Sequence, residues 1–291
     1  MIKNALFLLG IGLMALNLIG LVTPPRSSEL INETATYFVN DLTLSEQEFY
    51  QRLEVLDPSH RADYLTQLSR LVSESVMHYW QDEHRAEYRI LLPWSENFIL
   101  RALAYVNPKY FAMYEFQDHR KAIARGVGLC SQHSIITAGF LAEQGIPAKL
   151  IELHGHVILT AEVDEGQWWL LDPDYGLVLP FSLQEAEENP AEVAQFYHRA
   201  GFSDYDVDKV EEFFRTDNNI IFDGGAESYQ TWLFVIEKIS YVAKWAIPVG
   251  LLLPVFFTKD KRIWLWTLRL WRSRNLIGQV TDKLARAKIK G

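Results

Sequence analysis

Three side chains near the middle of the sequence combine residue types that support nucleophilic catalysis. Cys130 is the only cysteine among 291 residues, and His156 and Asp172 follow it at intervals of 26 and 16 residues. A cysteine thiolate can attack a carbonyl carbon, a histidine can take and return a proton, and a carboxylate can orient that histidine. These residue types predict a thiol-based acyl-transfer site, provided that the fold brings them together.

The segments around these side chains predict a helix followed by a meander of strands. The run SQHSIITAGFLAEQG after the cysteine has a helical pattern that ends at Gly145, with Pro147 just beyond. Three short β-rich runs come next, AKLIEL, HVILTAEV and QWWLLD. They are separated by His154-Gly155 and by a hairpin turn signal at residues 164–166. This order predicts an α+β fold rather than alternating βαβ units.

The same order predicts where the three side chains meet. Cys130 would stand in the first turn of the helix, where free backbone N–H groups and the positive end of the helix dipole favour a thiolate. His156 opens the second strand and Asp172 ends the third, and adjacent antiparallel strands can bring these two positions side by side. We therefore expect a thiolate nucleophile, an imidazole base and an orienting carboxylate, with the thiol pKa below its free value of about 8.5.

These segments resemble the transglutaminase-like superfamily of cysteine enzymes. In that family a Gly-x-Cys helix start precedes a Gly-Ile-Pro-Ala-like turn, a strand that begins with His and a strand that ends in Trp-x-x-x-Asp-Pro. The corresponding segments here are GLCSQHSIITAGFLAEQGIPAKL, GHVILTAEV and QWWLLDPDYG, within residues 120–176. The resemblance implies a papain-like α+β core with Cys130 as nucleophile, His156 as base and Asp172 as orienter.

The oxyanion donor departs from the papain pattern. Papain-type enzymes carry a glutamine six residues before the cysteine, and Ala124 occupies that position here. Trp94 and Gln117 are the candidates, alongside the backbone N–H of Cys130. The run RGVGLC is also similar to arylamine N-acetyltransferases, but their cofactor-binding features are not recognisable, and we expect no cofactor.

Neighbouring residues leave alternatives open. His133 lies three residues after Cys130 and is either a competing base or, as we expect, a helix-surface or packing histidine. His154 shares a strand with His156 and would face the same side if that strand is regular. A zinc site would lack a second cysteine and the HExxH spacing, so we expect no metal. Its possible ligands are Cys130, His154, His156 and either Asp172 or Asp174. Asp174 and Tyr175 either line the cleft or shape the turn after the third strand.

The N-terminus predicts a membrane anchor. No charged residue occurs from Ala5 to Val22, and 18 helical residues span about 27 Å, close to the hydrocarbon thickness of a bilayer. A cleaved signal peptide is the alternative, but the run LIGLVTPP lacks a clear small-x-small cleavage site. We expect an uncleaved anchor in residues 1–25.

A second apolar stretch, residues 239–257, predicts another span. Lys244 lies near its start, and proline is tolerated in membrane helices. Residues 259–291 follow with ten Lys/Arg and two Asp, a net charge of +8, and mix tryptophan with arginine as interfacial helices do. The positive-inside rule then places both termini in the cytoplasm and the central domain outside it, in the periplasm or the extracellular space. A buried, kinked core helix is the alternative for the second stretch.

The rest of the chain reads as mostly helical. Residues 28–90 have helical patterns, with a capping signal at Ser45 and a long amphipathic run, HRADYLTQLSRLVSESVMHYW. A break is expected at Asn107-Pro108, and DNNIIFDGGAES reads as a loop. The expected organisation is an anchor in 1–25, a helical region in 26–115, the catalytic core in 116–180, a helical cover or lid in 181–232, a second membrane helix in 233–258 and a basic tail in 259–291.

These features predict a membrane-tethered hydrolase or acyltransferase that acts on an amide or ester outside the cytoplasm. The net charge of −9 argues against a nucleic-acid partner. The expected partners are the lipid bilayer and a protein, peptide or other cell-envelope acyl substrate. The alternative is a catalytically silent scaffold of a cell-envelope assembly, such as one for polysaccharide export.

Overall fold

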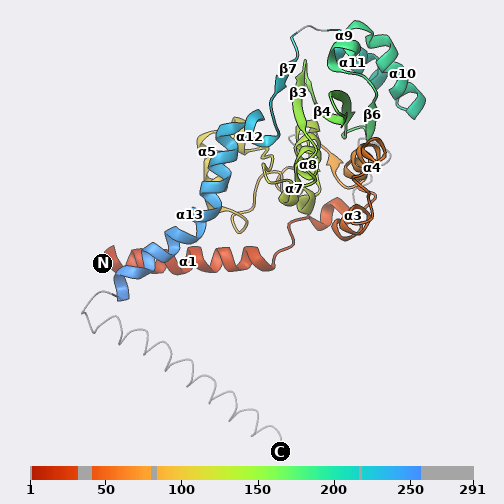
Figure 1. Cartoon of the computed structure of the whole chain (residues 1–291). Helices are drawn as coiled ribbons and strands as arrows, with labels where there is room; N and C mark the ends of the chain where they lie inside the picture. Colours follow the sequence, from red (N-terminus) through yellow and green to blue (C-terminus); the bar gives the residue numbers. More distant parts are fainter. Residues whose placement is uncertain (1, 32–40, 80–83, 216–217, 257–291) are drawn as a thin grey trace, which may run out of the picture. The chain divides into compact units, whose positions relative to one another are not determined.

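The protein is a mixed α+β structure with two compact units (Figure 1). The computed structural model describes residues 2–31, 41–79, 84–215 and 218–256. One unit is formed by residues 17–244, and the other by the two terminal segments on either side of it. The first of these units contains Cys130, His156 and Asp172, so each unit is described by itself below.

A five-stranded antiparallel sheet is the centre of the unit formed by residues 17–244. Its spatial order is β6-β5-β4-β3-β7. The strands are β3 (Ala148–Leu153), β4 (His156–Asp164), β5 (Gln167–Asp172), β6 (Leu177–Leu179) and β7 (Ile220–Phe222). The meander β3-β4-β5 confirms the three strands predicted from the sequence. The loop expected at 217–228 is wrong in part, because Ile220–Phe222 pairs with the open edge of β3 and Ala226–Tyr229 forms helix α12.

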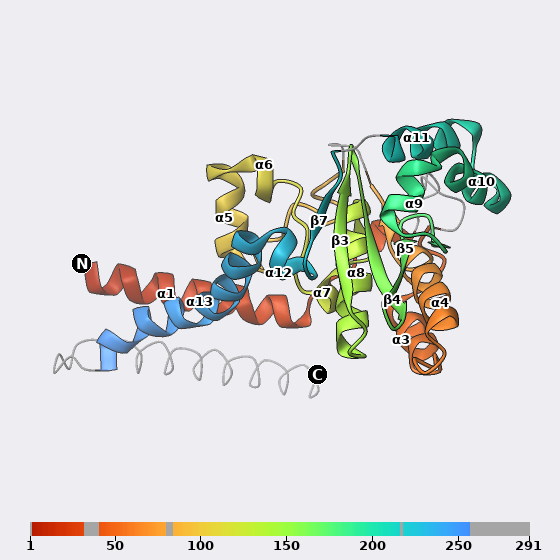
Figure 2. The same ribbon diagram turned by 45° about the horizontal axis from the view of Figure 1, so that its top comes forward.

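Alternation along the strands gives the sheet two buried faces. Leu150, Leu159 and Leu171 belong to one hydrophobic cluster, whereas their chain neighbours Ile151, Ile158 and Leu170 belong to another. Successive strand residues point to opposite faces, so the period of two separates the clusters. The sheet is thus covered on both sides, which Figure 2 shows from a second direction.

Helix α8 (Cys130–Glu143) packs against β3 and β4 on the first face. Helices α3 (Glu46–Leu53), α4 (Arg61–Ser73) and α7 (His119–Arg125) complete that side. The expected cap at Ser45 is confirmed, because its hydroxyl accepts from the Glu48 N–H and the Glu48 carboxylate accepts from the Ser45 N–H. The expected end of the α8 helix is confirmed as well, with Gly145 just past it at φ +67°.

Helices α9 (Leu183–Glu188), α10 (Pro190–Ala200) and α11 (Asp204–Phe214) cover the second face. They gather beside β6 in Figure 1 and lie together again in Figure 2. Their presence confirms the helices expected in this part of the chain. Helices α5 (Phe98–Val106) and α6 (Pro108–Phe111) meet at the predicted break, and the short α2 spans Ser28–Ile31.

The long amphipathic helix expected up to residue 80 is shorter than predicted. Helix α4 ends at Ser73, and strand β1 (Met77–His78) follows. This strand pairs in parallel with β2 (Val127–Gly128), so backbone pairing with a segment about 50 residues away ends the helix. The pairing also brings His78 next to the start of α8.

The terminal helices bear on the predicted membrane spans. Among the described residues, α1 (Ile2–Val22) is the one helix that is long and apolar enough to cross a membrane. The second predicted span forms the later part of α13 (Thr231–Phe256). Residue 257 and the basic tail, 259–291, lie outside the described residues, and this span stays a prediction. In the unit of terminal segments the two helices approach closely, since a Cβ on Gly10 would lie 3.0 Å from that of Leu251.

Candidate active site

Cys130 is the first residue of α8, as predicted, and a tightly packed turn holds it there. The N-cap residue Leu129 has extended backbone, so the chain turns into the helix at the cysteine. A Cβ on Gly128 would lie 2.4 Å from the Gln132 Cβ, and only glycine fits this approach. The Gln132 side chain in turn accepts from the Phe116 N–H and donates to the Phe116 carbonyl. The position of the thiol is therefore fixed by packing around the helix start.

His156 and Asp172 meet across two neighbouring strands. Strands β4 and β5 pair with Leu159 opposite Leu171. Continuing that register puts His156 opposite Asp174 and diagonal to Asp172, within the reach of long side chains. The His156 Nε2 lies 2.8 Å from the Asp172 Oδ2. The predicted histidine–carboxylate pair is present.

Helix α8 crosses the start of β4, which brings the thiol to the imidazole. The hydroxyl of Ser134, one helical turn after Cys130, donates to the carbonyl of Val157 at 2.9 Å. The Cys130 Sγ and the nearest polar atoms of His156 and Asp174 lie within 4.8 Å of one another, and all three residues are buried. Because the Nε2 atom of His156 is hydrogen-bonded to Asp172, its Nδ1 atom is the nitrogen that can exchange a proton with the Cys130 thiol.

Two tyrosines and a phenylalanine complete the surroundings of this pair. The Tyr197 hydroxyl, on α10, donates to the same Oδ2 of Asp172 at 2.8 Å. The Phe213 ring, on α11, stacks on the His156 ring with 5.5 Å between centroids, and Tyr175 packs edge-on against it. The helical cover thus contributes directly to the site. Cys130 is 5 % exposed and His156 is 4 % exposed, and the Phe213 ring of the cover lies on the imidazole.

Asp174 is the centre of a second buried network. Its Oδ1 lies 2.5 Å from the His78 Nδ1 and 3.3 Å from the His133 Nδ1. The two ring nitrogens of His133 also face the carbonyls of Leu129 (2.9 Å) and Val76 (3.1 Å). Burial alone would raise the pKa of Asp174, but His78 and His133 outweigh it and lower that pKa to about 2.

The ionisation of the thiol differs from the prediction. Burial raises the pKa of Cys130, and the opposing effect of His156 is smaller. The sequence placed the thiol at a helix start but did not show that it would be almost fully desolvated. In addition, both carboxylate oxygens of Glu115 accept from the Ser131 hydroxyl at this helix start (2.7 and 2.8 Å), so the positive end of the helix dipole already faces a carboxylate.

The pKa of the His156 imidazole is shifted in the direction expected for an imidazole beside a carboxylate. Burial by itself would lower the pKa of His156, but the charges of Asp172 and of the Cys130 thiolate raise it well above its usual range. Thiol and imidazole lie together in a water-poor site and therefore titrate as one pair.

The other predicted residues have the following places. Trp94 is 43 % exposed and stacks on Tyr105, and Gln117 is buried with its amide donating to the Glu115 carbonyl at 3.2 Å. These contacts assign neither of them as the oxyanion donor. His133 is fully buried, which agrees with the expected packing role and excludes the helix-surface alternative. His154 does not share a strand with His156, because β3 ends at Leu153 and His154 is exposed in the turn.

The sequence did not point to Tyr197, Phe213 or His78. Each is an aromatic residue in a segment read as packing or cover, and no short-range pattern marked it.

The zinc site considered from the sequence loses His154 as a ligand, because that residue is exposed in the turn. Two groups of buried residues still have potential ligand atoms within 4.8 Å of one another. They are Cys130, His156 and Asp174, and His78, His133 and Asp174.

No protein-family model matches the chain, and no curated protein or solved structure matches it significantly. The buried Cys130–His156 arrangement with its acidic neighbours is therefore the basis on which a function is assigned.

Proposed function

We propose that the protein is a transglutaminase-like thiol enzyme, tethered to a membrane, that acts on an amide or ester outside the cytoplasm by hydrolysis or acyl transfer. One observation carries this proposal. The hydrogen bond from His156 Nε2 to Asp172 leaves the other ring nitrogen to the thiol of Cys130. This is the relation of nucleophile, base and orienter on which a catalytic triad depends.

The proposed reaction proceeds through a thioester. Nδ1 of His156 takes the proton of the Cys130 thiol as Sγ bonds to the substrate carbonyl carbon. The tetrahedral intermediate collapses when the imidazolium returns that proton to the departing amine or alcohol. Water or an amine then attacks the thioester, loses a proton to His156, and releases Cys130 as the thiol. Asp172 stabilises the imidazolium formed in each half of the cycle, and Tyr197 holds Asp172.

The cover of α10 and α11 is part of this proposal as a lid. Phe213 stacks on the imidazole, and the thiol and imidazole are almost fully buried. An acyl group that enters this site has to displace Phe213 or Tyr175 from the imidazole. Lids of this kind exclude water from a thioester, which favours acyl transfer over hydrolysis.

An activated ester tests the proposal without knowledge of the natural substrate. The full chain in detergent, incubated with p-nitrophenyl acetate, should gain one acetyl group on Cys130 by mass spectrometry. His156→Ala should slow this acylation by about 10²-fold or more, the usual range of general-base catalysis. Cys130→Ala is the control that removes the acceptor. If wild type and His156→Ala acylate at the same rate, the thiol has no base.

Experiments on the same purified protein also test two other functions. A catalytically silent scaffold is favoured by the burial of the thiol, and it predicts no acylation although the chain is folded. A metal centre is favoured by the closeness of Cys130, His156 and Asp174. It predicts one zinc ion per chain after desalting, and loss of that zinc in Cys130→Ala.

A further inference from the structure

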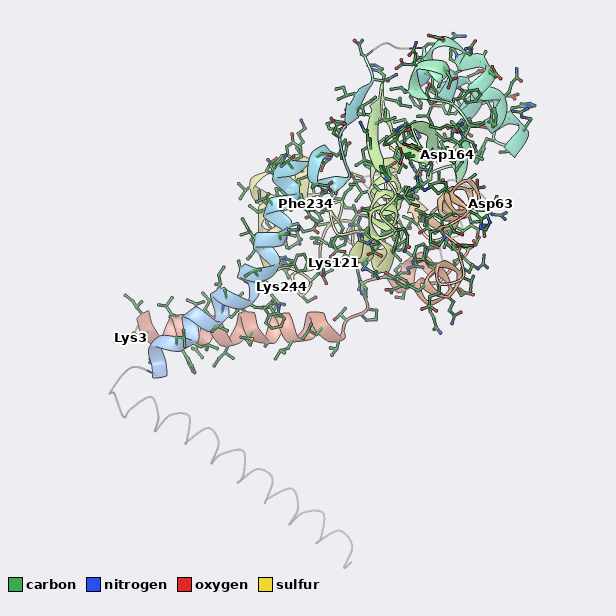
Figure 3. The ribbon with its side chains drawn as sticks, in the orientation of Figure 1. Lys3, Asp63, Lys121, Asp164, Phe234 and Lys244 are labelled. Carbon is green, nitrogen blue, oxygen red and sulfur yellow. The ribbon has the colours of Figure 1, made fainter. Side chains whose placement is uncertain are left out.

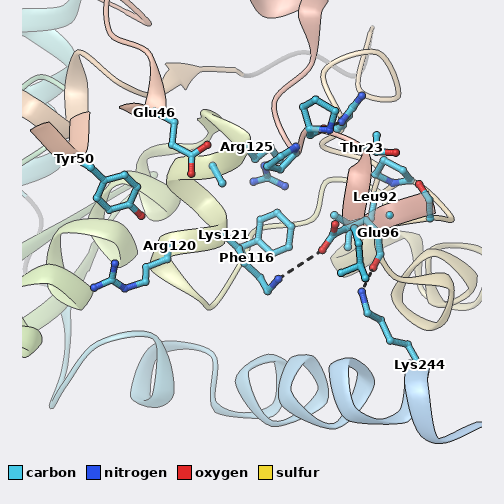
Figure 4. A pocket seen from close by; sticks show the side chains of 18 residues that line it. Thr23, Glu46, Tyr50, Leu92, Glu96, Phe116, Arg120, Lys121, Arg125 and Lys244 are labelled. Atoms are coloured by element: carbon cyan, nitrogen blue, oxygen red, sulfur yellow. Dashed lines mark hydrogen bonds and ion pairs between the residues drawn. The ribbon is translucent and has the colours of Figure 1, made fainter. Parts of the chain in front are cut away.

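A second cavity opens where α1 ends (Figure 4). Its volume is about 390 Å³, and it shares no lining residue with the Cys130 site. The last turn of α1 and the segment after it form one wall, from Gly20 to Pro25. The other walls come from the start of α3, the segment before α5, the helix α7 and Lys244 of α13. All of these residues belong to the unit of residues 17–244.

The formal charge of the residues that line this cavity is opposite in sign to the net charge of the chain outside residues 259–291. Outside residues 259–291 the chain carries a net charge of −17, because the tail holds +8 of the total of −9. The cavity nevertheless has five cations against two carboxylates, a formal net charge of +3. The cations are Arg89, Arg120, Lys121, Arg125 and Lys244, and the carboxylates are Glu46 and Glu96.

The five cations do not contribute equally. Arg125 is fully buried and donates to the carbonyls of Tyr114 and Val127, so its role is structural. Arg120 is held by Glu143, which does not line the cavity.

Lys121 is the cation best placed for a ligand. It is about one-third exposed, and its Nζ lies 3.7 Å from the Glu96 carboxylate, which is too long for a strong hydrogen bond. Lys244 donates to the Glu96 carbonyl at 2.5 Å. Lys121 and Lys244 lie near each other (Figure 3), and both point toward Glu96 (Figure 4). Arg89 adds a guanidinium that donates to the Pro24 carbonyl.

The remaining lining is apolar and continuous with the candidate membrane helix. Leu21, Leu92 and Phe116 lie in the wall, with Pro24 and Pro25 beside them. Because Gly20 and Leu21 are the last turn of α1, a membrane crossed by α1 would have its headgroup region at this cavity. An apolar wall next to a cluster of Lys and Arg at that depth suits an amphipathic anion.

We propose that this cavity binds the phosphodiester headgroup of an anionic phospholipid, with Lys121 and Arg89 on the phosphate and the apolar wall against the glycerol ester region. The site would fix the unit of residues 17–244 on the membrane surface by a lipid contact in addition to α1. It rests on α1 being a membrane span and does not depend on catalysis by Cys130.

The test compares lipids retained by the full chain. The protein in detergent is mixed with equal amounts of phosphatidylglycerol and phosphatidylcholine, and native mass spectrometry counts the lipids that stay bound. Wild type should retain one phosphatidylglycerol in preference to phosphatidylcholine. Lys121→Gln and Arg89→Gln should each lower that preference about fivefold, as expected for one cation near a lipid phosphate.

Two further variants separate the charge effect from a folding defect. Glu46→Gln removes a carboxylate from the cavity and should increase the preference for phosphatidylglycerol, which misfolding cannot do. Lys209→Gln, on α11, removes an exposed lysine that pairs with Glu212 and should leave the preference unchanged. Equal retention of both lipids by wild type, or the same result for Lys121→Gln and Lys209→Gln, would overturn the proposal.

Inorganic phosphate distinguishes a lipid site from a soluble phosphate site. Millimolar inorganic phosphate, added alone, should leave the bound phosphatidylglycerol in place, because the apolar wall contributes to binding a lipid only. Displacement of the lipid by phosphate would show a site for a soluble anion and would also overturn the proposal.

Discussion

At the scale of single residues, the carboxylates of Asp172 and Asp174 lie two positions apart and bind different partners. Asp172 holds the imidazole of His156 and is itself held by the hydroxyl of Tyr197. Asp174 lies close to the same thiol and imidazole but is bound to His78 and His133. One carboxylate thus orients the His156 ring, and the other is held by two buried histidines behind it.

Asp172→Asn should keep the fold and lose most of the acylation rate, by up to about 10⁴-fold in a triad of this kind. The asparagine can hold His156 in the wrong tautomer and cannot stabilise the imidazolium. Tyr197→Phe, which removes only the hydrogen bond that supports Asp172, should cost about tenfold. The measurement is the rate of acetyl transfer from p-nitrophenyl acetate to Cys130. An Asp172→Asn variant as fast as wild type would remove Asp172 from the triad.

Asp174 should make the protein sensitive to acid. Its pKa is about 2 in the folded protein and about 4 when unfolded, so its stabilising effect is present above pH 4 and is lost as pH falls toward 2. The difference corresponds to about 2.5 kcal/mol at neutral pH. Asp174→Asn should therefore lower the free energy of unfolding by at least that amount at pH 7. Urea unfolding between pH 2 and pH 7 checks this, and parallel pH curves for the two proteins would contradict it.

The thiol–imidazole pair should shift the pH dependence of acylation toward alkaline pH. The thiol and imidazole together hold one proton in the form that reacts. Because the pKa of His156 is raised, the pair binds a second proton at low pH and is then unreactive. The acylation rate should therefore rise with pH through a midpoint above 6.5, not below it. Acetyl transfer measured from pH 5 to pH 9 tests this, with free cysteine as the reference. A midpoint near pH 5 would mean that the thiolate forms more easily than its burial allows.

At the scale of elements, helix α8 positions the thiol, and helices α10 and α11 cover the imidazole and the carboxylate beside it. The hydrogen bond from Ser134 to Val157 sets α8 across the start of β4. The cover then packs its own hydrophobic cluster on the other face of the sheet and places Phe213 over the imidazole. The cover therefore encloses the imidazole, and α8 sets the position of the thiol.

Phe213→Ala should open the site. The side chain that stacks on His156 is removed, while Asp172, Tyr197 and Cys130 keep their contacts. Alkylation of Cys130 by iodoacetamide at pH 8 should become severalfold faster than in wild type. Phe196→Ala, on α10 and packed against Phe181, is the matched control and should change the rate little. Equal rates for the wild type and Phe213→Ala would mean that this ring does not limit access.

At the scale of the whole molecule, charge and hydropathy are distributed unevenly along the chain. The tail of residues 259–291 carries +8 and the remainder −17. Helix α1 is apolar enough to cross a membrane, and the stretch at 239–257 is the second predicted span. The positive-inside rule expects short basic segments beside a span to stay in the cytoplasm, whereas long domains cross largely regardless of their charge.

A pair of reporter fusions tests this topology. A reporter fused after Gly291 should be active only as a cytoplasmic reporter, and one inserted near Asp217 only as an external reporter. A C-terminus outside the cytoplasm would show that the chain crosses the membrane once, at α1, and would leave the second span without support.

The sequence by itself determined the elements around the site. The glycine stop of α8 and the alternation of β3, β4 and β5 are local patterns, and so is the place of Cys130 at a helix start. Helical periodicity and strand alternation act over a few residues, so they can be read along the chain. The pairing of His156 with Asp172 follows from a short meander, in which turn lengths limit the register.

Only the tertiary structure decided the chemistry of that site. His78 reaches Asp174 across 96 residues of sequence, and Tyr197 reaches Asp172 from a helix that the sequence left as a cover. The pKa of Cys130 moved in the direction opposite to the prediction, because helix position is a local property whereas desolvation depends on everything packed around the thiol. Burial and long-range contacts are sums over distant segments, and no short pattern encodes them.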